Sequence, residues 1–328
     1  MKNHLKRIFA GFLAAGMALT LTACGDKPAA KQDEPSQTGQ PADAAGDAGA
    51  DGRTFAVVFP IVHPFFEPIG VDAEEYGAEK GWKVITKAPD SSNAQQQIEI
   101  VENLISMGVD GIAVGPTDPD ALASTIDKAL EAGIKVICFE TDSPNSKRLA
   151  YIGTDNYNAG RHMGAVIEKN LGGKGNIAIL TGPSSTTDTT ARLEGYRNIL
   201  ANYPDMTEVI APADCAWDTA KAQSTVESWL SAYDLDAIVC QNDGMAVGAG
   251  NAAGANSGIV ITGLDGTPDG YEAIKDGRIT GTVAQDGGLM ASSGVEAAVT
   301  LLDGGTLENN LIIADSVWID SSNVADYE

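Results

Sequence analysis

The chain has 328 residues, which is enough for two domains of ordinary size that each bury a core of their own. Its 45 acidic and 21 basic residues give a formal net charge of −24 at pH 7. Because a body this acidic is repelled by phosphate backbones, we expect no nucleic-acid partner.

Residues 1–24 predict a lipoprotein signal peptide rather than part of a fold. A basic start precedes an apolar stretch, 8–21, that is too short for a membrane span that stays in place. The sequence Leu21-Thr22-Ala23-Cys24 then resembles the bacterial lipoprotein signal, in which the cysteine becomes the lipidated first residue. We therefore expect a lipid on Cys24 and a membrane anchor on the extracytoplasmic face.

Residues 25–52 predict a disordered tether. This segment contains no Val, Ile, Leu, Met or aromatic residue and consists mostly of Gly, Ala, Asp, Gln and Pro. Such a composition buries too little apolar surface to offset the entropy of ordering the chain. The tether would hold a globular body near the membrane without fixing its orientation.

From residue 53 onward, short apolar runs alternate with segments of helical periodicity, and the rhythm restarts once. The first set predicts strands at 55–59, 83–85, 111–114 and 136–139, with helices at 65–80, 93–106 and 119–132. The second set predicts strands at 176–180, 208–210, 237–240 and 259–264, with helices at 187–201, 219–232, 245–253 and 271–275. A strand at 282–284, a helix at 289–302 and apolar runs at 311–313 and 317–319 follow. This pattern predicts an α/β fold with two Rossmann-like lobes, each a parallel sheet covered by helices.

Polar or aromatic side chains follow five of the predicted strands. In open parallel sheets, ligands bind outside the carboxyl ends of the strands. Any one of these residues could simply cap the next helix, and for Asn242 or Asp243 that alternative is at least as good. Their recurrence favours a polar ligand site, formed by His63-Pro64-Phe65-Phe66, Glu140-Thr141-Asp142, Gln241-Asn242-Asp243, Asp265-Gly266 and Gln285-Asp286.

The adjacent rings of Phe65 and Phe66 stand at a strand-to-helix turn in a chain with few aromatic residues. Two interpretations remain open. Both rings could pack the helix onto the sheet, or one could form a wall of the ligand site while the other packs behind it.

The sequence lacks the common patterns of catalysis and metal binding. It contains no Gly-x-Ser-x-Gly, no His-Glu-x-x-His and no Gly-x-x-x-x-Gly-Lys phosphate loop, and its cysteines have no zinc-ligand spacing. We therefore expect no cofactor and no metal. An enzyme acting on sugars would need an acid–base pair, for which Glu140 and Asp265 are the candidates; the hydrogen-bonding groups and aromatic rings instead favour a protein that binds a sugar.

Specific motifs resemble those of the ribose-binding protein family, the type I periplasmic binding proteins that serve sugar ABC importers. The resemblance runs from Phe55 to Ile319. It rests on His63-Pro64-Phe65-Phe66, Pro212-Ala213-Asp214, Gln241-Asn242-Asp243-Gly244-Met245-Ala246, Gly263-Leu264-Asp265-Gly266-Thr267-Pro268-Asp269-Gly270 and Thr282-Val283-Ala284-Gln285.

The resemblance implies ligand-binding roles for ten residues. It implies that Asn242, Asp265 and Gln285 hydrogen-bond sugar hydroxyls. It also implies a carboxylate contact from Glu140 and a polar contact from His63, where the family has Asn. Stacking walls would come from Phe65, Phe66 and, opposite them, Trp217.

Two departures from the family pattern change the expected ligand. Thr141 stands where the ribose binder has an Arg, and a second family Arg falls at Thr190, with Arg192 close by. Losing these forked donors changes which hydroxyls are read. The sequence therefore leaves another pentose, a hexose or a different polyol open beside ribose.

The resemblance also implies two lobes with a ligand cleft between them. The first would comprise 53–154 and 286–313, and the second 155–285 and 314–328. The chain would cross near 153–155, 285 and 313–315, hinge closure would bury the ligand, and the closed monomer would dock on an importer permease. A ligand-presenting sensory subunit for a membrane receptor or kinase is the alternative. A transcriptional regulator with this fold is disfavoured by the signal peptide.

Overall fold

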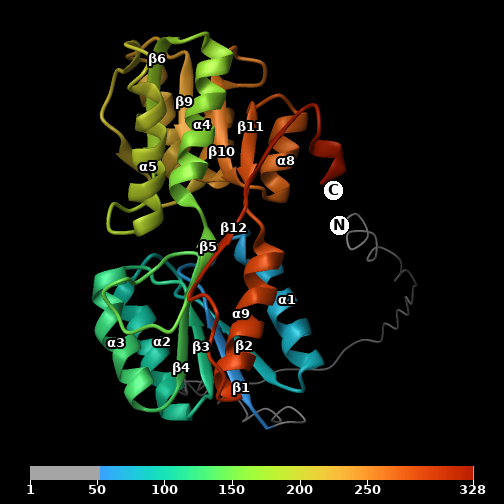
Figure 1. Ribbon diagram of the computed structural model, residues 1–328. Helices are drawn as coiled ribbons and strands as arrows, with labels where there is room; N and C mark the ends of the chain where they lie inside the picture. The colour runs from blue at the N-terminus through green and yellow to red at the C-terminus, as the bar shows by residue number, and fades with distance from the viewer. Residues whose placement is uncertain (1–51, 328) are drawn as a thin grey trace, which may run out of the picture. The chain divides into compact units, whose positions relative to one another are not determined.

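The computed structural model describes residues 52–327 (Figure 1). The expected signal peptide, Cys24 and the tether up to residue 51 lie outside the described residues. Two sheets organise the described part of the chain, and helices cover both faces of each.

The first sheet has six strands, all parallel, in the order β12-β5-β4-β3-β1-β2. Central strands such as β3 are buried along their whole length, so their Val, Ile and Ala side chains fill the core on both faces. The strands are β1 (Thr54–Val58), β2 (Lys83–Lys87), β3 (Gly111–Val114), β4 (Lys135–Phe139), β5 (Tyr151–Thr154) and β12 (Leu311–Ala314).

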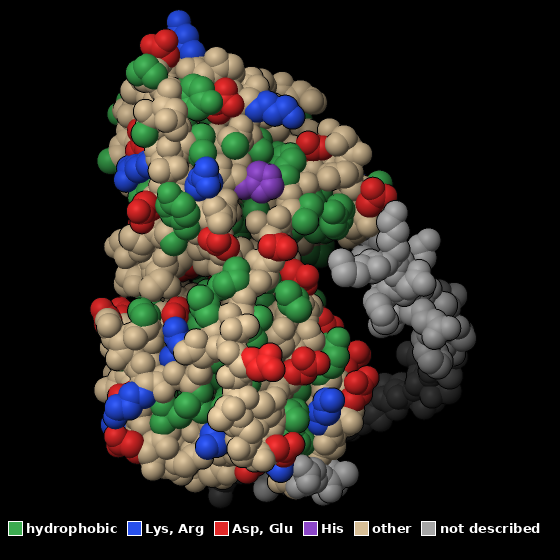
Figure 2. All heavy atoms as spheres, in the orientation of Figure 1, with side chains coloured by type: hydrophobic (Ala, Val, Ile, Leu, Met, Phe, Trp, Pro, Cys, Tyr) green, Lys and Arg blue, Asp and Glu red, His purple; other side chains and the backbone are tan. Residues whose placement is uncertain are grey.

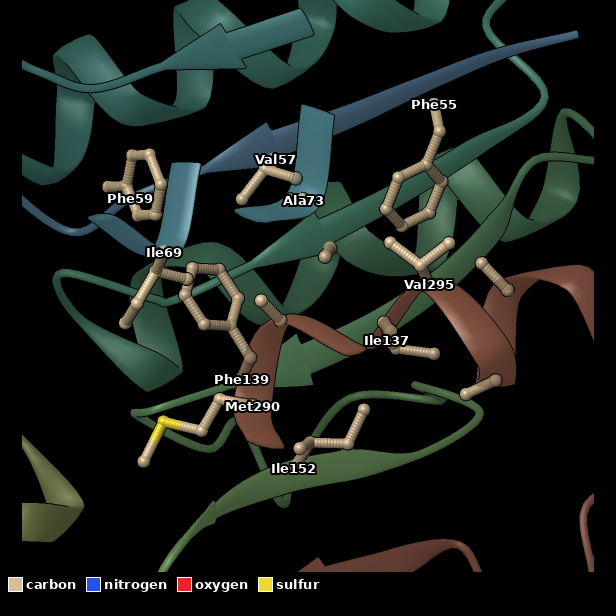
Figure 3. Packing of buried hydrophobic residues seen from close by; sticks show 14 of the residues in the cluster. Phe55, Val57, Phe59, Ile69, Ala73, Ile137, Phe139, Ile152, Met290 and Val295 are labelled. Atoms are coloured by element: carbon tan, nitrogen blue, oxygen red, sulfur yellow. The ribbon is translucent and has the colours of Figure 1, made fainter. Parts of the chain in front are cut away.

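Four helices enclose this sheet. Helices α2 (Ala94–Met107) and α3 (Pro119–Glu131) cover one face, and α1 (Phe66–Glu79) covers the other together with α9 (Gly287–Leu302) (Figure 1). Met290 and Val295 of α9 pack into the same cluster as Phe55, Phe59 and Phe139 (Figure 3). A late segment of the chain thus completes the first core.

The second sheet follows the order β13-β11-β10-β9-β6-β7, with β8 paired to β6. All its pairs are parallel except β11 with β13, which is antiparallel. The strands are β6 (Lys174–Thr181), β7 (Asp205–Glu208), β8 (Ala213–Asp214), β9 (Ala237–Cys240), β10 (Val260–Asp265), β11 (Gly281–Ala284) and β13 (Val317–Asp320).

Helices α4 (Asn156–Leu171) and α5 (Thr187–Leu200) bury their apolar sides on one face of the second sheet. On the other face lie α6 (Thr219–Leu230), α7 (Asp243–Ala253) and α8 (Pro268–Lys275), and a short 3-10 helix, Val324–Asp326, follows near the end of the chain. The predicted α/β fold with two mostly parallel sheets is therefore confirmed.

The chain passes between the two sheets three times, as predicted. It crosses from β5 to α4, from β11 to α9, and from β12 to β13 (Figure 1). Each connection contains only one to two residues outside regular elements, namely Asp155, Gln285–Asp286 and Asp315–Ser316.

Two local predictions were wrong. The strand expected at 208–210 lies earlier, at Asp205–Glu208, and helix α4 was not expected at all. Glycines weaken the apolar pattern of α4 because they serve close contact instead: a Cβ on Gly160 would lie 2.1 Å from the carbonyl oxygen of Arg192. The backbones of α4 and α5 therefore touch where a sequence pattern shows only small residues.

Between residues 52 and 327, none of the helices has the length and apolar character needed to cross a membrane. Cys138, Cys215 and Cys240 are free and buried, which matches their interpretation as buried apolar side chains.

Candidate functional site

A polar cavity lies where the carboxyl ends of both sheets meet. It holds about 480 Å³ of space free of protein atoms, within the range of roughly 300–1,000 Å³ that is usual for small-molecule sites. Eight of the ten predicted ligand-binding residues line it: His63, Phe66, Glu140, Thr141, Arg192, Trp217, Asn242 and Asp265.

The two adjacent phenylalanines have different positions. Phe66 lines the cavity and stacks on Phe59 with ring centroids 5.2 Å apart. Phe65 meets Phe66 edge-on, also at 5.2 Å, and packs in the core of the first sheet rather than against the cavity. One ring thus forms the wall and the other supports it.

Asn242 serves both alternatives left open by the sequence. Its Oδ1 accepts a hydrogen bond of 2.8 Å from the backbone N–H of Met245 and so caps α7. Its Nδ2 lies 3.2 Å from Nε2 of His63, which comes from the first sheet. A helix cap therefore also reaches across the cavity.

Backbone strain is concentrated at this cavity. Of the five non-glycine residues with positive φ among residues 52–327, three line it: Glu140 at 59°, Trp217 at 64° and Asp265 at 139°. Such conformations cost about 1–3 kcal/mol each and collect at functional sites, where the surrounding structure enforces them. The strain aims one aromatic and two carboxylate side chains into the same space.

Arg192 is a buried cation between carboxylates. Its Nε donates to Oδ1 of Asn156 and its Nη1 to the carbonyl of Gln241, both at 2.8 Å. Its Nη2 lies 3.6 Å from Glu140 and makes no hydrogen bond. Asp188 lies 3.8 Å from Nη1, and its Oδ1 also has no partner. The wall therefore presents a free donor beside a free acceptor.

Burial shifts the pKa of several groups that line the cavity. Desolvation, reinforced by the charge of Asp188, raises the pKa of Glu140 to about 7, although Arg192 and the hydroxyl of Thr141 act in the opposite sense. Desolvation and then the charge of Asp243 raise the pKa of Asp265 well above its usual value. Desolvation lowers the pKa of His63 to about 4.

Gln285 does not line the cavity, although it contacts a residue that does. Its Nε2 donates to Oδ1 of Asp265 at 2.9 Å, and its Oε1 accepts from the hydroxyl of Thr154 at 2.6 Å. The structure thus brings Gln285 to the edge of the site, behind Asp265.

The cavity also contains residues that the sequence did not single out. Asp188 is the main one, and its signal was available: it lies in the first turn after a buried strand and four residues before Arg192, on the same helix face. The others are Pro60, Ile61, Ser92, Thr117, Pro183 and Thr186. Within the described part of the chain, no group of His, Cys, Asp and Glu could hold a metal ion.

The profile of the periplasmic binding protein domain matches residues 55–306, which is most of the chain. The chain belongs to this family. A periplasmic binding protein is an extracytoplasmic solute-binding protein and not an enzyme, so the sugar-acting enzyme considered from the sequence is set aside.

Relatives of this periplasmic binding protein carry names from the same class. A xylitol-binding protein of Mycolicibacterium smegmatis is 28% identical, with 98% of this chain and 88% of the relative covered. The ribose import binding protein of Escherichia coli is 29% identical, with 76% and 84% covered.

A solved structure has the same fold. An ABC transporter solute-binding protein of Burkholderia graminis in complex with D-arabinose superposes with a TM-score of 0.79 at 29% identity, covering 86% of this chain and 99% of the other. The predicted resemblance to ribose-binding-type proteins is confirmed, and the sensory alternative is not favoured.

Proposed function

We propose that this periplasmic binding protein captures a monosaccharide or a related polyol in the cavity and delivers it to an ABC importer. The observation that carries the proposal is the composition of the wall. Two aromatic residues, Phe66 and Trp217, line the same space as an unpaired Arg192 donor and an unpaired Asp188 acceptor. Adjacent hydroxyls on one small molecule would satisfy both groups, while the rings cover its C–H faces.

The proposed ligand-binding residues act directly or through a neighbour. Phe65 would hold Phe66 in place, and Gln285 would orient Asp265. The complete proposed set is His63, Phe65, Phe66, Glu140, Thr141, Arg192, Trp217, Asn242, Asp265 and Gln285. The names of the relatives, which refer to xylitol, ribose and D-arabinose, support a neutral polyol as the ligand.

We further propose that the lobes, 53–154 with 286–313 and 155–285 with 314–328, close around the ligand as two bodies of one monomer. The three short crossings support this, because hinge residues absorb the backbone changes of such motions. The closed form would then dock on the importer permease.

A thermal-shift screen over pentoses, hexoses, inositols and linear polyols tests the ligand class. A ligand that binds only the folded form raises the melting temperature by mass action. We expect at least one neutral polyol to do so. A screen in which no sugar or polyol binds would contradict the proposed function.

Asp265→Ala tests the site itself. A charged hydrogen bond contributes roughly 1.5–3 kcal/mol, so the substitution should weaken binding at least about tenfold. Asp269→Ala, which removes an exposed carboxylate four residues further along the chain, is the matched control and should bind normally. Equal affinities for the two variants would place the ligand elsewhere.

We also propose that Cys24 carries the lipid that anchors the protein. Two or more acyl chains give stable attachment where one chain is marginal. Cys24→Ser should release the protein from membranes, as measured by fractionation and immunoblotting. Unchanged membrane retention of a cleaved Cys24→Ser protein would exclude this anchor.

A further inference from the structure

Thr154 lies where all three crossings between the sheets come together. It is the last residue of β5, directly before the first crossing. In the sheet it pairs with Ala314, the last residue before the third crossing. Its hydroxyl bonds to Gln285, which begins the second crossing. One buried side chain, 3% exposed, therefore contacts the other two connections.

The hydrogen bonds continue from Thr154 into the cavity. The hydroxyl donates to Oε1 of Gln285 at 2.6 Å, and Nε2 of Gln285 donates to Oδ1 of Asp265 at 2.9 Å. The backbone N–H of Gln285 also donates to the carbonyl of Asp265 at 3.0 Å. Asp265 itself lines the cavity with its backbone at a φ of 139°.

The direction of this chain of hydrogen bonds follows from its end. An ionised carboxylate only accepts, so the amide nitrogen of Gln285 must face Asp265. The amide oxygen is then left to face Thr154, whose hydroxyl must donate. Without that hydroxyl, Oε1 would lack its donor at this buried junction, and the amide would be freer to rotate away from Asp265.

We propose that Thr154 is a positioning residue that couples ligand capture at Asp265 to closure of the cleft, acting through Gln285. This inference rests on the proposed function, because it assigns a role in the same binding event. Thr154 touches no ligand: it holds the crossings in the closed arrangement that presents Asp265. Opening the cleft turns the chain at these crossings and so strains or breaks the bond between Thr154 and Gln285.

Thr154→Val removes the hydroxyl while keeping the shape of the side chain. Losing one buried hydrogen bond should raise the Kd about threefold to tenfold. Because the closed form is destabilised, the change should appear mainly as faster dissociation, and small-angle scattering of the ligand-free variant should show a larger radius of gyration. Thr154→Ser keeps the hydroxyl and should restore both values.

The probes are xylitol, D-ribose and D-arabinose, measured by calorimetry and stopped flow. Thr181→Val, a buried threonine at the end of β6 that makes none of these bonds, is the matched control. A Thr154→Val protein with wild-type dissociation and radius of gyration would overturn the inference, even if its melting temperature fell. If the wild type binds none of the probes, the proposed ligand class fails, while the ligand-free scattering of Thr154→Val still decides the role of Thr154.

Discussion

Two buried carboxylates stand in the first turns of two helices over the same sheet, and they have opposite surroundings. Asp243, in α7, accepts hydrogen bonds from the backbone N–H groups of Gly266 and Thr267 and from the hydroxyls of Thr267 and Thr282. Asp188, in α5, has no hydrogen-bond partner for Oδ1 and only a 3.8 Å ion pair with Arg192. The same residue type is completed by protein in one place and left incomplete in the other.

The surroundings of Asp243 are shaped for it alone. A Cβ on Gly263 would lie 2.3 Å from Oδ1 of Asp243, and one on Gly270 would lie 2.4 Å from Oδ2. Glycines therefore make room for this carboxylate under the loop that carries Asp265. Asp188 instead lines an open cavity. The difference indicates that Asp243 holds the fold and that Asp188 awaits a ligand.

The largest expected effect separates the two residues by stability. Asp243→Ala leaves several buried donors without an acceptor, at about 1–3 kcal/mol each, so the free energy of unfolding should fall by about 3 kcal/mol or more. Asp188→Ala breaks no hydrogen bond and relieves repulsion with Glu140, so it should change stability by less than about 1 kcal/mol. Denaturation in urea measures both.

Comparable losses in the two variants would refute the distinction between a structural and a ligand-facing carboxylate. Asp243→Asn is a useful intermediate, because its amide keeps one acceptor oxygen. It should unfold between the wild type and Asp243→Ala.

The second prediction reverses the order by measuring affinity. Asp188→Asn keeps the size of the side chain but loses the charge of a ligand acceptor, so polyol binding should weaken about tenfold. Asp234→Asn, an exposed substitution in the same half of the chain, should leave the Kd unchanged. Calorimetry with a polyol found in the screen measures the difference. Normal affinity in Asp188→Asn would show that the unpaired oxygen does not face the ligand.

The sequence predicted the frame of this comparison and missed half of it. Buried strands ending in Asn242 and Asp265 gave the fold and one wall, because strand ends carry side chains to the switch point of a parallel sheet. Asp188 escaped because its significance depends on missing donors, which no sequence pattern shows. The position of Gln285 behind Asp265 depends on Thr154, 131 residues away, and that contact exists only in three dimensions.

The third prediction concerns pH and the opposite shifts of Glu140 and His63. The raised pKa of Glu140 gives stability below its unfolded value, near 4.5, that is lost as the pH rises through about 7. The lowered pKa of His63 gives stability above its unfolded value, 6.5, that is lost as the pH falls through about 4. The two contributions therefore oppose each other between these limits.

Glu140→Gln separates them. The stability difference between wild type and variant should shift against the wild type as the pH rises from about 4.5 to 7. Chemical denaturation of the ligand-free proteins at several pH values gives this difference. A constant difference would mean that Glu140 titrates normally and that its contact with Asp188 has no energetic consequence.

The smallest expected effect on affinity concerns Trp217, the aromatic wall on the same side as Asp188. Its ring fits over Gly182, where a Cβ would lie 2.0 Å from the indole, and Arg192 lies over its face at 5.7 Å. Trp217→Phe keeps a ring but loses part of this contact, so binding should weaken only about twofold to fivefold. The change in tryptophan fluorescence on binding should nevertheless be largely lost, because Trp82 and Trp229 are buried in the cores. Trp318→Phe is the control and should keep the response. If Trp217→Phe retains the full signal, the ligand does not stack on this wall, and the aromatic half of the proposed site must be redrawn around Phe66.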